Sequence, residues 1–460
     1  MYDYRKLTLG IAPTRRDFFP APSEAQRIKG KMLERIRKVA SAIPNLEIFD
    51  IDWLNEEGMI YDSKDVEKVA RYFEEKKIDA LFMPHANFGQ EEPVGQLGKR
   101  MGVPFLLWGP RDEAPPADPR ANRQTDIQCG LFASSRALKR YGVPFTYIEN
   151  CWLDSPVFAD EFERFIRTAS AVKAFRHCRV GQLSVRPRQF LSVKINEGEL
   201  MERFGIEVVP IESSEVLSTI REEIKNKDNI QRILKEWESV LDMSEVPDEQ
   251  KTTMAAAEAG ILKIAETYDC TVMASECWSM FGRNLNIRSC FVFGDLTDHG
   301  LPTACETDIH GAITQAIVTG ATRLDPPVFL ADVTIRHPTN DNAELFWHCG
   351  PFPKSLAREG SKPSVLQCHG QYELRHGDIT ICRFDADRGN YQFFVGEGKG
   401  IEGPATNGNY VWVEVDDWVK WEKKLIDGPY IHHTVGAHGK YKKALIEACK
   451  YMNGVQPDIV

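Results

Sequence analysis

Short apolar runs alternate with longer helical patterns along the first 325 residues, and this alternation constrains the fold more than any other feature of the chain. Successive parallel strands need a crossover connection of a dozen or more residues, which is usually a helix. The alternation therefore predicts an α/β architecture with parallel sheets and crossover helices. We expect two Rossmann-like α/β domains, over residues 1–176 and 177–325.

The positions of the individual elements follow from the apolar runs and from helical periodicity. In the first domain we expect strands at 6–13, 45–52, 78–87, 103–110 and 144–150, and helices at 23–42, 64–77, 91–102, 124–142 and 157–175. In the second domain we expect strands at 178–185, 206–211, 270–275 and 289–294, with helices at 195–204 and within the Glu-, Lys- and Ala-rich segment 213–268.

The chain changes character from residue 326 onward, where β-branched and aromatic runs are separated by turn residues. This pattern predicts a β-rich, antiparallel C-terminal domain over residues 326–460, a sandwich or a barrel. Helices are expected there at 416–425 and 440–451. The segment between these helices, which contains His432, His433 and Thr434, is expected to be a loop.

Composition excludes several classes of protein. Apolar residues make up 42% and charged residues 27% of the chain, as in ordinary globular proteins. The net charge of −10 argues against nucleic acid or an anionic membrane as a partner. The N-terminus lacks an apolar signal region and no run approaches 18 apolar residues, so we expect a cytoplasmic protein. The 11 cysteines form no CxxC pair and are expected to be reduced core residues, without a zinc site or disulfide framework.

The stretch LPTACETDIHGA, residues 301–312, carries the strongest indication of chemistry. Glu306, Asp308 and His310 share one face if a strand continues through them, whereas Glu306 and His310 lie one turn apart if a helix has begun. Open α/β sheets bind ligands where a strand leads into a helix. The alternative is that Asp308 or Thr307 is only a helix N-cap.

Two further places combine polar groups with the ends of expected elements. Glu276 lies beside Trp278, and the His432–His433 pair is followed by His438. Carboxylates with an imidazole suit an octahedral cation, and the imidazole favours Mn²⁺ over Mg²⁺. Alternatively, Glu276 is a solvated side chain and the histidines are structural.

Candidate sugar-binding residues are more dispersed. Arg16 follows the first expected strand and is suited to a polyhydroxyl or anionic ligand, unless it only pairs with Asp17 on the surface. Asn87 suits sugar hydroxyls, and Trp278 suits the C–H face of a sugar. Two further histidines, His337 and His348, are either ligand-binding or structural residues of the β domain.

Three of these motifs resemble the L-fucose isomerase family. ACETDIHGA is similar to its Glu-x-Asp motif, PPVFLADVTIRHP to the strand that opens its C-terminal domain, and IHHTVGAHG to the His-His-Thr loop shared with L-arabinose isomerases. The resemblance covers essentially the whole chain and implies two α/β domains followed by a β-rich domain. It also implies a homo-oligomer, a trimer or hexamer.

The resemblance further implies aldose–ketose isomerisation with Mn²⁺, or with Mg²⁺ or Co²⁺. It implies Glu276, Glu306, Asp308 and His433 as metal ligands, with Glu306 and Asp308 also moving the proton through a cis-enediol. A histidine of the arabinose branch lies at His337, but the fucose branch lacks it, so His337 is left out of the set. The expected substrate is an open-chain pentose or deoxyhexose, such as arabinose or fucose, contacted by Arg16, Asn87, Trp278 and His348.

The sequence leaves two other functions open. Tandem α/β domains also form metal-free sugar-binding proteins. The same acidic pair would serve a metal-dependent epimerase or lyase acting on a related sugar.

Overall fold

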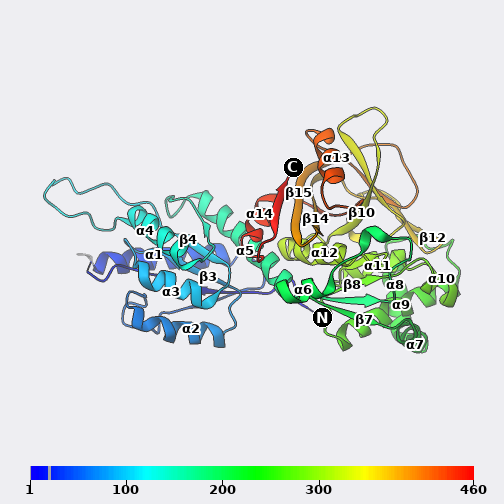
Figure 1. Cartoon of the computed structure of the whole chain (residues 1–460), viewed down its shortest axis with the longest axis horizontal. Helices are drawn as coiled ribbons and strands as arrows, with labels where there is room; N and C mark the ends of the chain where they lie inside the picture. The colour runs from blue at the N-terminus through cyan, green and yellow to red at the C-terminus, as the bar shows by residue number, and fades with distance from the viewer. Residues whose placement is uncertain (1, 19–21) are drawn as a thin grey trace. The chain divides into compact units, whose positions relative to one another are not determined.

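The computed structural model describes residues 2–18 and 22–460, which divide into two compact units. One unit comprises Arg5–Val172, and the other comprises Lys173–Val460 together with residues 2–4. Among the described residues, none of the helices has the length and apolar character required to cross a membrane. Figure 1 shows the elements of each unit.

The Arg5–Val172 unit is built on a five-stranded parallel sheet with the order β2-β1-β3-β4-β5. The expected alternation of strand and helix is confirmed throughout it. The strands are β1 (Leu7–Ile11), β2 (Leu46–Asp50), β3 (Ala80–Pro84), β4 (Phe105–Trp108) and β5 (Thr146–Tyr147), and the helices are α1 (Pro22–Ala40), α2 (Val66–Glu75), α3 (Glu91–Met101), α4 (Ile127–Tyr141) and α5 (Pro156–Arg176). Strands β1, β3 and β4 are buried at every position, as expected for a sheet covered on both faces.

The second unit begins with a four-stranded parallel sheet with the order β7-β6-β8-β9. Its strands are β6 (Arg179–Leu183), β7 (Glu207–Ile211), β8 (Val272–Ser275) and β9 (Thr303–Cys305). Its helices are α6 (Glu197–Phe204), α7 (Ser213–Glu223), α8 (Lys227–Glu238), α9 (Asp248–Thr267), α10 (Met280–Leu285), α11 (Cys290–Asp298) and α12 (Ile309–Thr322).

The strand expected at 289–294 is wrong, because these residues begin helix α11. Eight of the nine residues of α11 are buried. A helix that is buried on all sides shows a continuous apolar run, which periodicity alone does not distinguish from a buried strand. Gly294 permits this burial, since a Cβ at this position would lie 2.3 Å from the carbonyl oxygen of Phe352.

The rest of the second unit is a closed six-stranded barrel, so of the two architectures expected for the C-terminal domain the barrel is confirmed. Closure follows from the strand order β16-β11-β10-β17-β14-β15 together with the pairing of β15 with β16. The barrel strands are β10 (Phe329–Arg336), β11 (Ala343–His348), β14 (Gly377–Asp387), β15 (Asn390–Ile401), β16 (Asn409–Glu414) and β17 (His433–His438). Strands β12 (Ser364–Leu366), β13 (His369–Glu373) and β18 (Gln456–Ile459) extend it, with helices α13 (Trp418–Asp427) and α14 (Lys442–Cys449).

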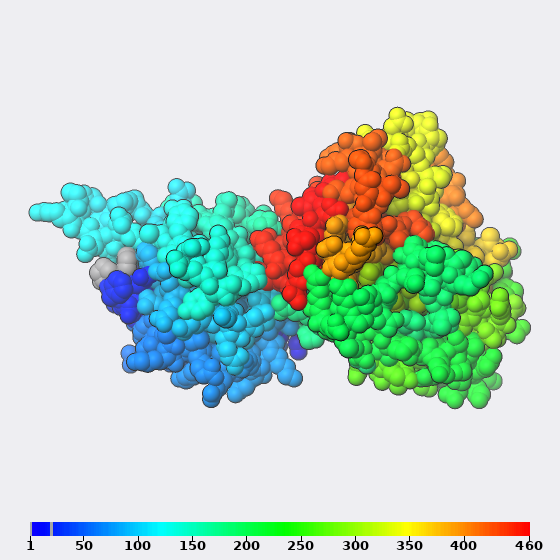
Figure 2. Space-filling view, in the orientation of Figure 1, coloured from blue at the N-terminus to red at the C-terminus, as the bar shows by residue number. Residues whose placement is uncertain are grey.

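The loop expected around His433 is partly wrong, because His433 is the first residue of strand β17. Strand β17 is buried at all six positions and lies between β10 and β14 in the barrel wall. Adjacent histidines and two glycines obscured the strand in the sequence. In the space-filling view, the central α/β layer and the barrel form one body (Figure 2). The boundary expected at residues 325 and 326 therefore falls within a single compact unit.

Candidate active site

The turn after strand β9 gives Glu306 and Asp308 different surroundings. Glu306 and Thr307 have left-handed backbone conformations, with φ of 60° and 56°. The alternation expected of a continuing strand therefore stops at β9. Asp308 caps helix α12, since its Oδ1 accepts a hydrogen bond from the Gly311 amide at 2.9 Å. The capping alternative is correct for Asp308, but capping is only one of its contacts.

Asp308 is completely buried, and its carboxylate is held by two side chains of the barrel. Arg383 on β14 forms a two-point ion pair with it, with 3.1 Å between Nη2 and Oδ1. The Nδ1 of His433 donates to Oδ2 at 2.9 Å. Burial opposes ionisation, but Arg383 and His433 hold the pKa of Asp308 well below its usual range. Because both oxygens are engaged, Asp308 orients His433, and its expected roles as metal ligand and proton carrier stay predictions.

The imidazole of His433 connects Asp308 to a second group of side chains. Its Nε2 lies 3.0 Å from Glu306 Oε2 and 3.4 Å from Asp332 Oδ1. Burial lowers the pKa of His433, but the hydrogen bonds with Asp308 and Glu306 outweigh burial and raise the pKa to about 9. The ring is therefore oriented from one side by Asp308 and presents Nε2 to the carboxylates on the other side.

Four potential ligand atoms converge around this Nε2. Glu306, His348 and His433 form one group whose ligand atoms all lie within 4.8 Å of one another, and Asp332, His432 and His433 form another. His348 Nε2 is 3.9 Å from Asp332 Oδ1. The residues come from neighbouring elements, because Asp332 on β10 is in register with His433 on β17, and His348 ends the adjacent strand β11.

This donor set fits a divalent cation. Asp332 Oδ1 and His348 Nε2 are buried and have no hydrogen-bond partner among the described residues. A buried polar atom without a partner costs about 1–3 kcal/mol, so two such atoms facing the same point indicate a missing ligand. Two carboxylates with two imidazoles match the preferences of Mn²⁺ and similar ions.

Aromatic side chains border this group of ligand atoms. Trp278 donates from Nε1 to Glu306 Oε1 at 2.8 Å and is 39% exposed, so one face of its ring is open to solvent. Phe190 stacks against His433 with 5.8 Å between ring centroids and contacts Trp278 edge to face at 5.3 Å. Such a wall suits the apolar face of a sugar ring or chain.

Three residues considered from the sequence lie outside this group of ligands. Both oxygens of Glu276 accept hydrogen bonds at the start of α10 from the amides of Ser279 and Met280, each at 2.8 Å, and its expected role as a metal ligand stays a prediction. His310 turns instead to Asp385, at 2.8 Å. His337 packs edge to face on Trp412.

Arg16 and Asn87 belong to the Arg5–Val172 unit, where the structure brings them together. The Arg16 amide donates to Asn87 Oδ1 at 2.8 Å, and the Arg16 guanidinium pairs with Glu91 at 2.9 Å. The ion pair with Asp17 considered from the sequence is therefore replaced by a pair with Glu91. Their expected contact with substrate stays a prediction.

Asp332 and Arg383 were missed in the sequence, and His348 was expected to contact substrate rather than a metal. An ionisable residue inside an apolar strand run was the available signal for both: Asp332 interrupts VFLADV, and Arg383 interrupts ITICRF. Burying a charge is costly unless it is paired, so such residues usually have a partner. Their partner was not visible in the sequence, because Arg383 is 75 residues from Asp308.

Comparison with known protein families gives two matches. Residues 10–176 match the model described as "Fucose/sulfoquinovose isomerase, N-terminal domain". Residues 367–456 match "L-fucose isomerase, C-terminal domain". Together these matches span more than half of the chain.

Curated relatives of this chain are also sugar isomerases by name. A sulfoquinovose isomerase from Alkalicoccus urumqiensis is 23% identical over 394 residues, which cover 82% of this chain and 85% of that protein. One from Priestia megaterium is also 23% identical, over 82% of this chain and 84% of that protein. A solved structure of a solute-binding protein from Bacillus halodurans with bound myo-inositol is 12% identical to this chain, and the match covers 70% of this chain and 91% of that protein. Its TM-score of 0.17 is too low to inform the fold.

Proposed function

This chain belongs to the L-fucose isomerase family and is a sugar isomerase, an intramolecular oxidoreductase; from that premise we propose that it interconverts an aldose and its ketose at the Glu306–His348–His433 group. We further propose that the enzyme depends on a divalent cation, with Mn²⁺ as the first candidate. The observation that carries this proposal is the pair of buried, unpartnered ligand atoms, Asp332 Oδ1 and His348 Nε2.

Asp332, His348 and His433 would hold the cation, with His432 at the rim. Ligation by His348 Nε2 requires the ring proton on Nδ1, where Cys349 Sγ at 3.3 Å would accept it in place of the hydrogen bond from the Cys349 amide. When bound, the cation would polarise the substrate carbonyl and stabilise negative charge on the adjacent oxygens. Asp308 fixes the ring of His433 so that its Nδ1 carries a proton and its Nε2 is available for ligation.

We assign the proton transfer between neighbouring carbons to Glu306. Its Oε1 is anchored by Trp278, the residue that would also contact the apolar face of the sugar. The hydrogen bond from Trp278 holds the Glu306 carboxylate in a fixed position at the edge of the substrate. The other oxygen, Oε2, would then accept the proton from C2 and return it at C1. A carboxylate that serves mainly as a base should bind the cation less firmly than Asp332.

We propose an anionic aldose, with sulfoquinovose tested first, because the curated relatives act on that sugar by name. Arg283 and Arg288 line a surface hollow that also includes Trp278. Guanidinium groups bind sulfonate, phosphate and carboxylate oxygens well. Arabinose and fucose, which the sequence suggested, become the neutral comparison substrates.

The test is a screen of sulfoquinovose, L-fucose, L-arabinose and D-glucose with metal-free protein and added Mn²⁺. We expect turnover that chelator abolishes and Mn²⁺ restores, and incorporation of one deuterium at C1 or C2 when the reaction runs in D₂O. Full activity in chelator with no metal found by elemental analysis contradicts the cation dependence. Deuterium at another carbon indicates an epimerase or lyase instead.

Two variants separate the assigned roles. Glu306→Gln should lower turnover by about 100-fold or more while keeping most of the Mn²⁺ affinity. Asp332→Asn should weaken Mn²⁺ binding itself, and excess Mn²⁺ should recover part of its turnover. If both variants lose Mn²⁺ binding equally, then Glu306 is a ligand of the same rank and the division of roles is wrong.

A further inference from the structure

Four cysteine thiols gather next to the candidate active site. Cys290 Sγ lies 3.2 Å from Cys349 Sγ, and Cys277 Sγ lies 3.1 Å from Cys305 Sγ. The second pair also interacts with Cys290. These thiols come from four separate segments, so no CxxC spacing in the sequence indicates the cluster.

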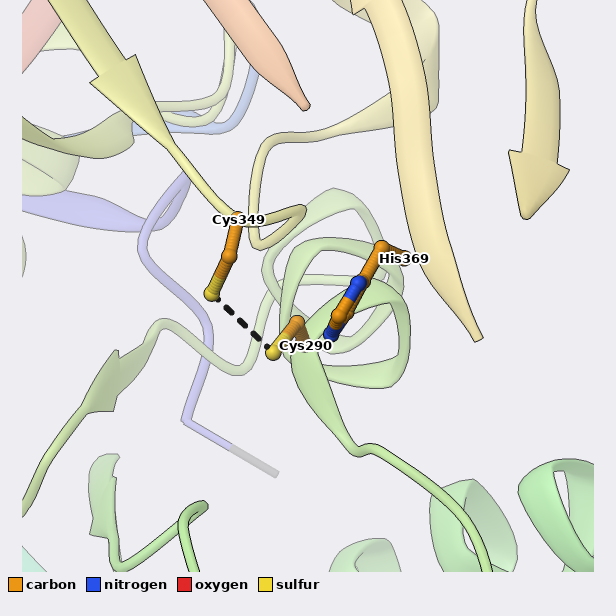
Figure 3. Close-up of side chains that lie close together, drawn as sticks. All are labelled: Cys290, Cys349 and His369. Carbon is orange, nitrogen blue, oxygen red and sulfur yellow. Dashed lines mark hydrogen bonds between the residues drawn. The ribbon is translucent and has the colours of Figure 1, made fainter. Parts of the chain in front are cut away.

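The imidazole of His369 lies beside these thiols. The ligand atoms of Cys290, Cys349 and His369 all lie within 4.8 Å of one another. Figure 3 shows Cys290 at the start of α11 and Cys349 just beyond the end of β11, with the ring of His369 beside Cys290. Burial lowers the pKa of His369, so its ring is neutral at neutral pH, which is the form that binds metals.

The backbone is shaped to let these three segments meet. Gly350 has φ of 138°, a conformation that favours glycine. A Cβ at this position would lie 2.6 Å from the Gly370 amide nitrogen, 3.1 Å from His369 Cα and 3.3 Å from Cys290 Cβ. Any larger residue would therefore separate the Cys349 segment from the other two.

The chemistry of the three groups selects a different kind of ion from the one expected at Glu306. Two thiolates with an imidazole prefer soft or borderline ions, and Zn²⁺ with two Cys and one His leaves a fourth position open. Zinc–sulfur bonds of about 2.3 Å in a tetrahedral site place two sulfurs about 3.8 Å apart. The sulfurs of Cys290 and Cys349 would need to separate by only about 0.6 Å, starting from 3.2 Å, to receive the ion.

We propose that Cys290, Cys349 and His369 form a second metal site, specific for Zn²⁺ or a similar thiol-preferring ion and separate from the Glu306–His348–His433 group. Cys277 and Cys305 adjoin it and can supply a further thiolate. Metal binding there involves no change of oxidation state: two thiols release their protons to solvent and bind the ion as thiolates.

The two sites are adjacent, so an ion bound by Cys290, Cys349 and His369 should affect the Glu306–His348–His433 group. Cys349 directly follows His348, and the Cys349 amide donates to His348 Nδ1 at 2.9 Å. The Sγ of Cys349 is also 3.3 Å from this Nδ1. An ion that holds Cys349 therefore fixes the orientation of His348, whose Nε2 faces Asp332.

The experiment titrates reduced, metal-free, full-length protein with Co²⁺, and then with Zn²⁺. Thiolate-to-cobalt charge transfer gives an absorption band in the near ultraviolet that carboxylate and imidazole ligands do not produce. We expect this band in the wild type and in Cys129→Ser, a control at an exposed cysteine of the other unit, and its loss on addition of Zn²⁺. Cys290→Ser and His369→Ala should weaken Co²⁺ binding at this band by at least 10-fold, and elemental analysis should find about one equivalent of zinc fewer in each.

Because Cys290 is buried and its variant can lose stability, His369→Ala at a half-buried position serves as the second variant. Its Co²⁺ and Zn²⁺ binding is measured directly, so this test does not depend on the proposed isomerase activity. The proposal is overturned if the wild type shows no charge-transfer band, or if His369→Ala and wild type bind Co²⁺ and Zn²⁺ identically. It is equally overturned if mass spectrometry finds a Cys290–Cys349 disulfide that forms in air and no bound zinc.

Discussion

The buried ion-pair network behind His433 gives the most discriminating prediction, which concerns Asp308→Asn. This change keeps the size of the side chain and an oxygen for the Gly311 cap, but removes the negative charge that Arg383 and His433 share. The amide can also present its NH₂ group to His433 Nδ1, which would move the ring proton to Nε2 and block ligation there.

Two losses of different origin are expected from Asp308→Asn. Breaking a buried ion pair by removing one partner costs about 3–5 kcal/mol, and we expect the lower end because Asp385 still pairs with Arg383 at 2.9 Å. Loss of a group that orients a metal ligand typically lowers affinity by about 10- to 100-fold. That factor corresponds to about 1.4–2.7 kcal/mol in Mn²⁺ binding.

Asp385→Asn is the matched control, since it weakens the same Arg383 network without touching His433. Its carboxylate contacts Arg383 and His310 and is also buried. Thermal unfolding should show similar destabilisation of both variants, whereas calorimetric Mn²⁺ titration should show weakened binding only for Asp308→Asn. Equal Mn²⁺ affinities in the two variants would refute the positioning role. Complete loss of binding in Asp308→Asn would instead restore Asp308 as a direct ligand.

Three further predictions concern titration and ligation. Burial lowers the pKa of His433 and of His348, but neighbouring carboxylates outweigh burial, and Cys349 also acts on His348. The pKa of His433 is therefore raised to about 9 and that of His348 to about 10. Ion pairing by these histidines thus stabilises the metal-free protein fully below pH about 6.5, and this stabilisation is lost as the pH rises through 9. Protons compete with the cation, so Mn²⁺ affinity should increase from pH 6 to 9 with release of about two protons per ion, and pH-independent calorimetric affinities would contradict this. His348→Ala should lower Mn²⁺ affinity by about 10-fold or more while His337→Ala leaves it unchanged, and the reverse order would show that the wrong histidine was assigned. Burial, reinforced by the nearby Asp295, raises the pKa of Glu258 to about 10, so above pH 4.5 the protein must take up a proton at Glu258 when it folds. This uptake costs more stability as the pH rises, so Glu258→Gln should raise the midpoint of thermal unfolding at pH 8 more than at pH 5.

The architecture was accessible from the sequence because it rests on local patterns. The alternation of apolar runs and helical periods reports which face of each element is buried, and burial dominates the free energy of folding. Strands β1, β3, β6 and β8 and nearly all the helices followed from it. The prediction for 289–294 failed for the same reason, because an element buried on all sides loses its period, and the strand that begins at His433 was also missed.

The candidate site was only half accessible. Glu306 and His433 were identified by motif and resemblance, and they lie 3.0 Å apart across 127 residues of sequence. What the tertiary structure decided was the surroundings of each charged group. Asp308 and Glu276 look like ligands in the sequence, but Arg383 and backbone amides engage them. Asp332, without a motif of its own, has a buried Oδ1 that accepts no hydrogen bond among the described residues.

The sequence by itself determined the fold class and the family, because periodicity and short motifs are local properties of the chain. Only the tertiary structure decided which groups each carboxylate contacts, and that four scattered cysteines converge beside them. Ligand geometry depends on contacts between residues tens to more than one hundred positions apart, as for Asp308 with His433 and Cys290 with Cys349. Such contacts are set by sheet register and barrel closure, which no local pattern records.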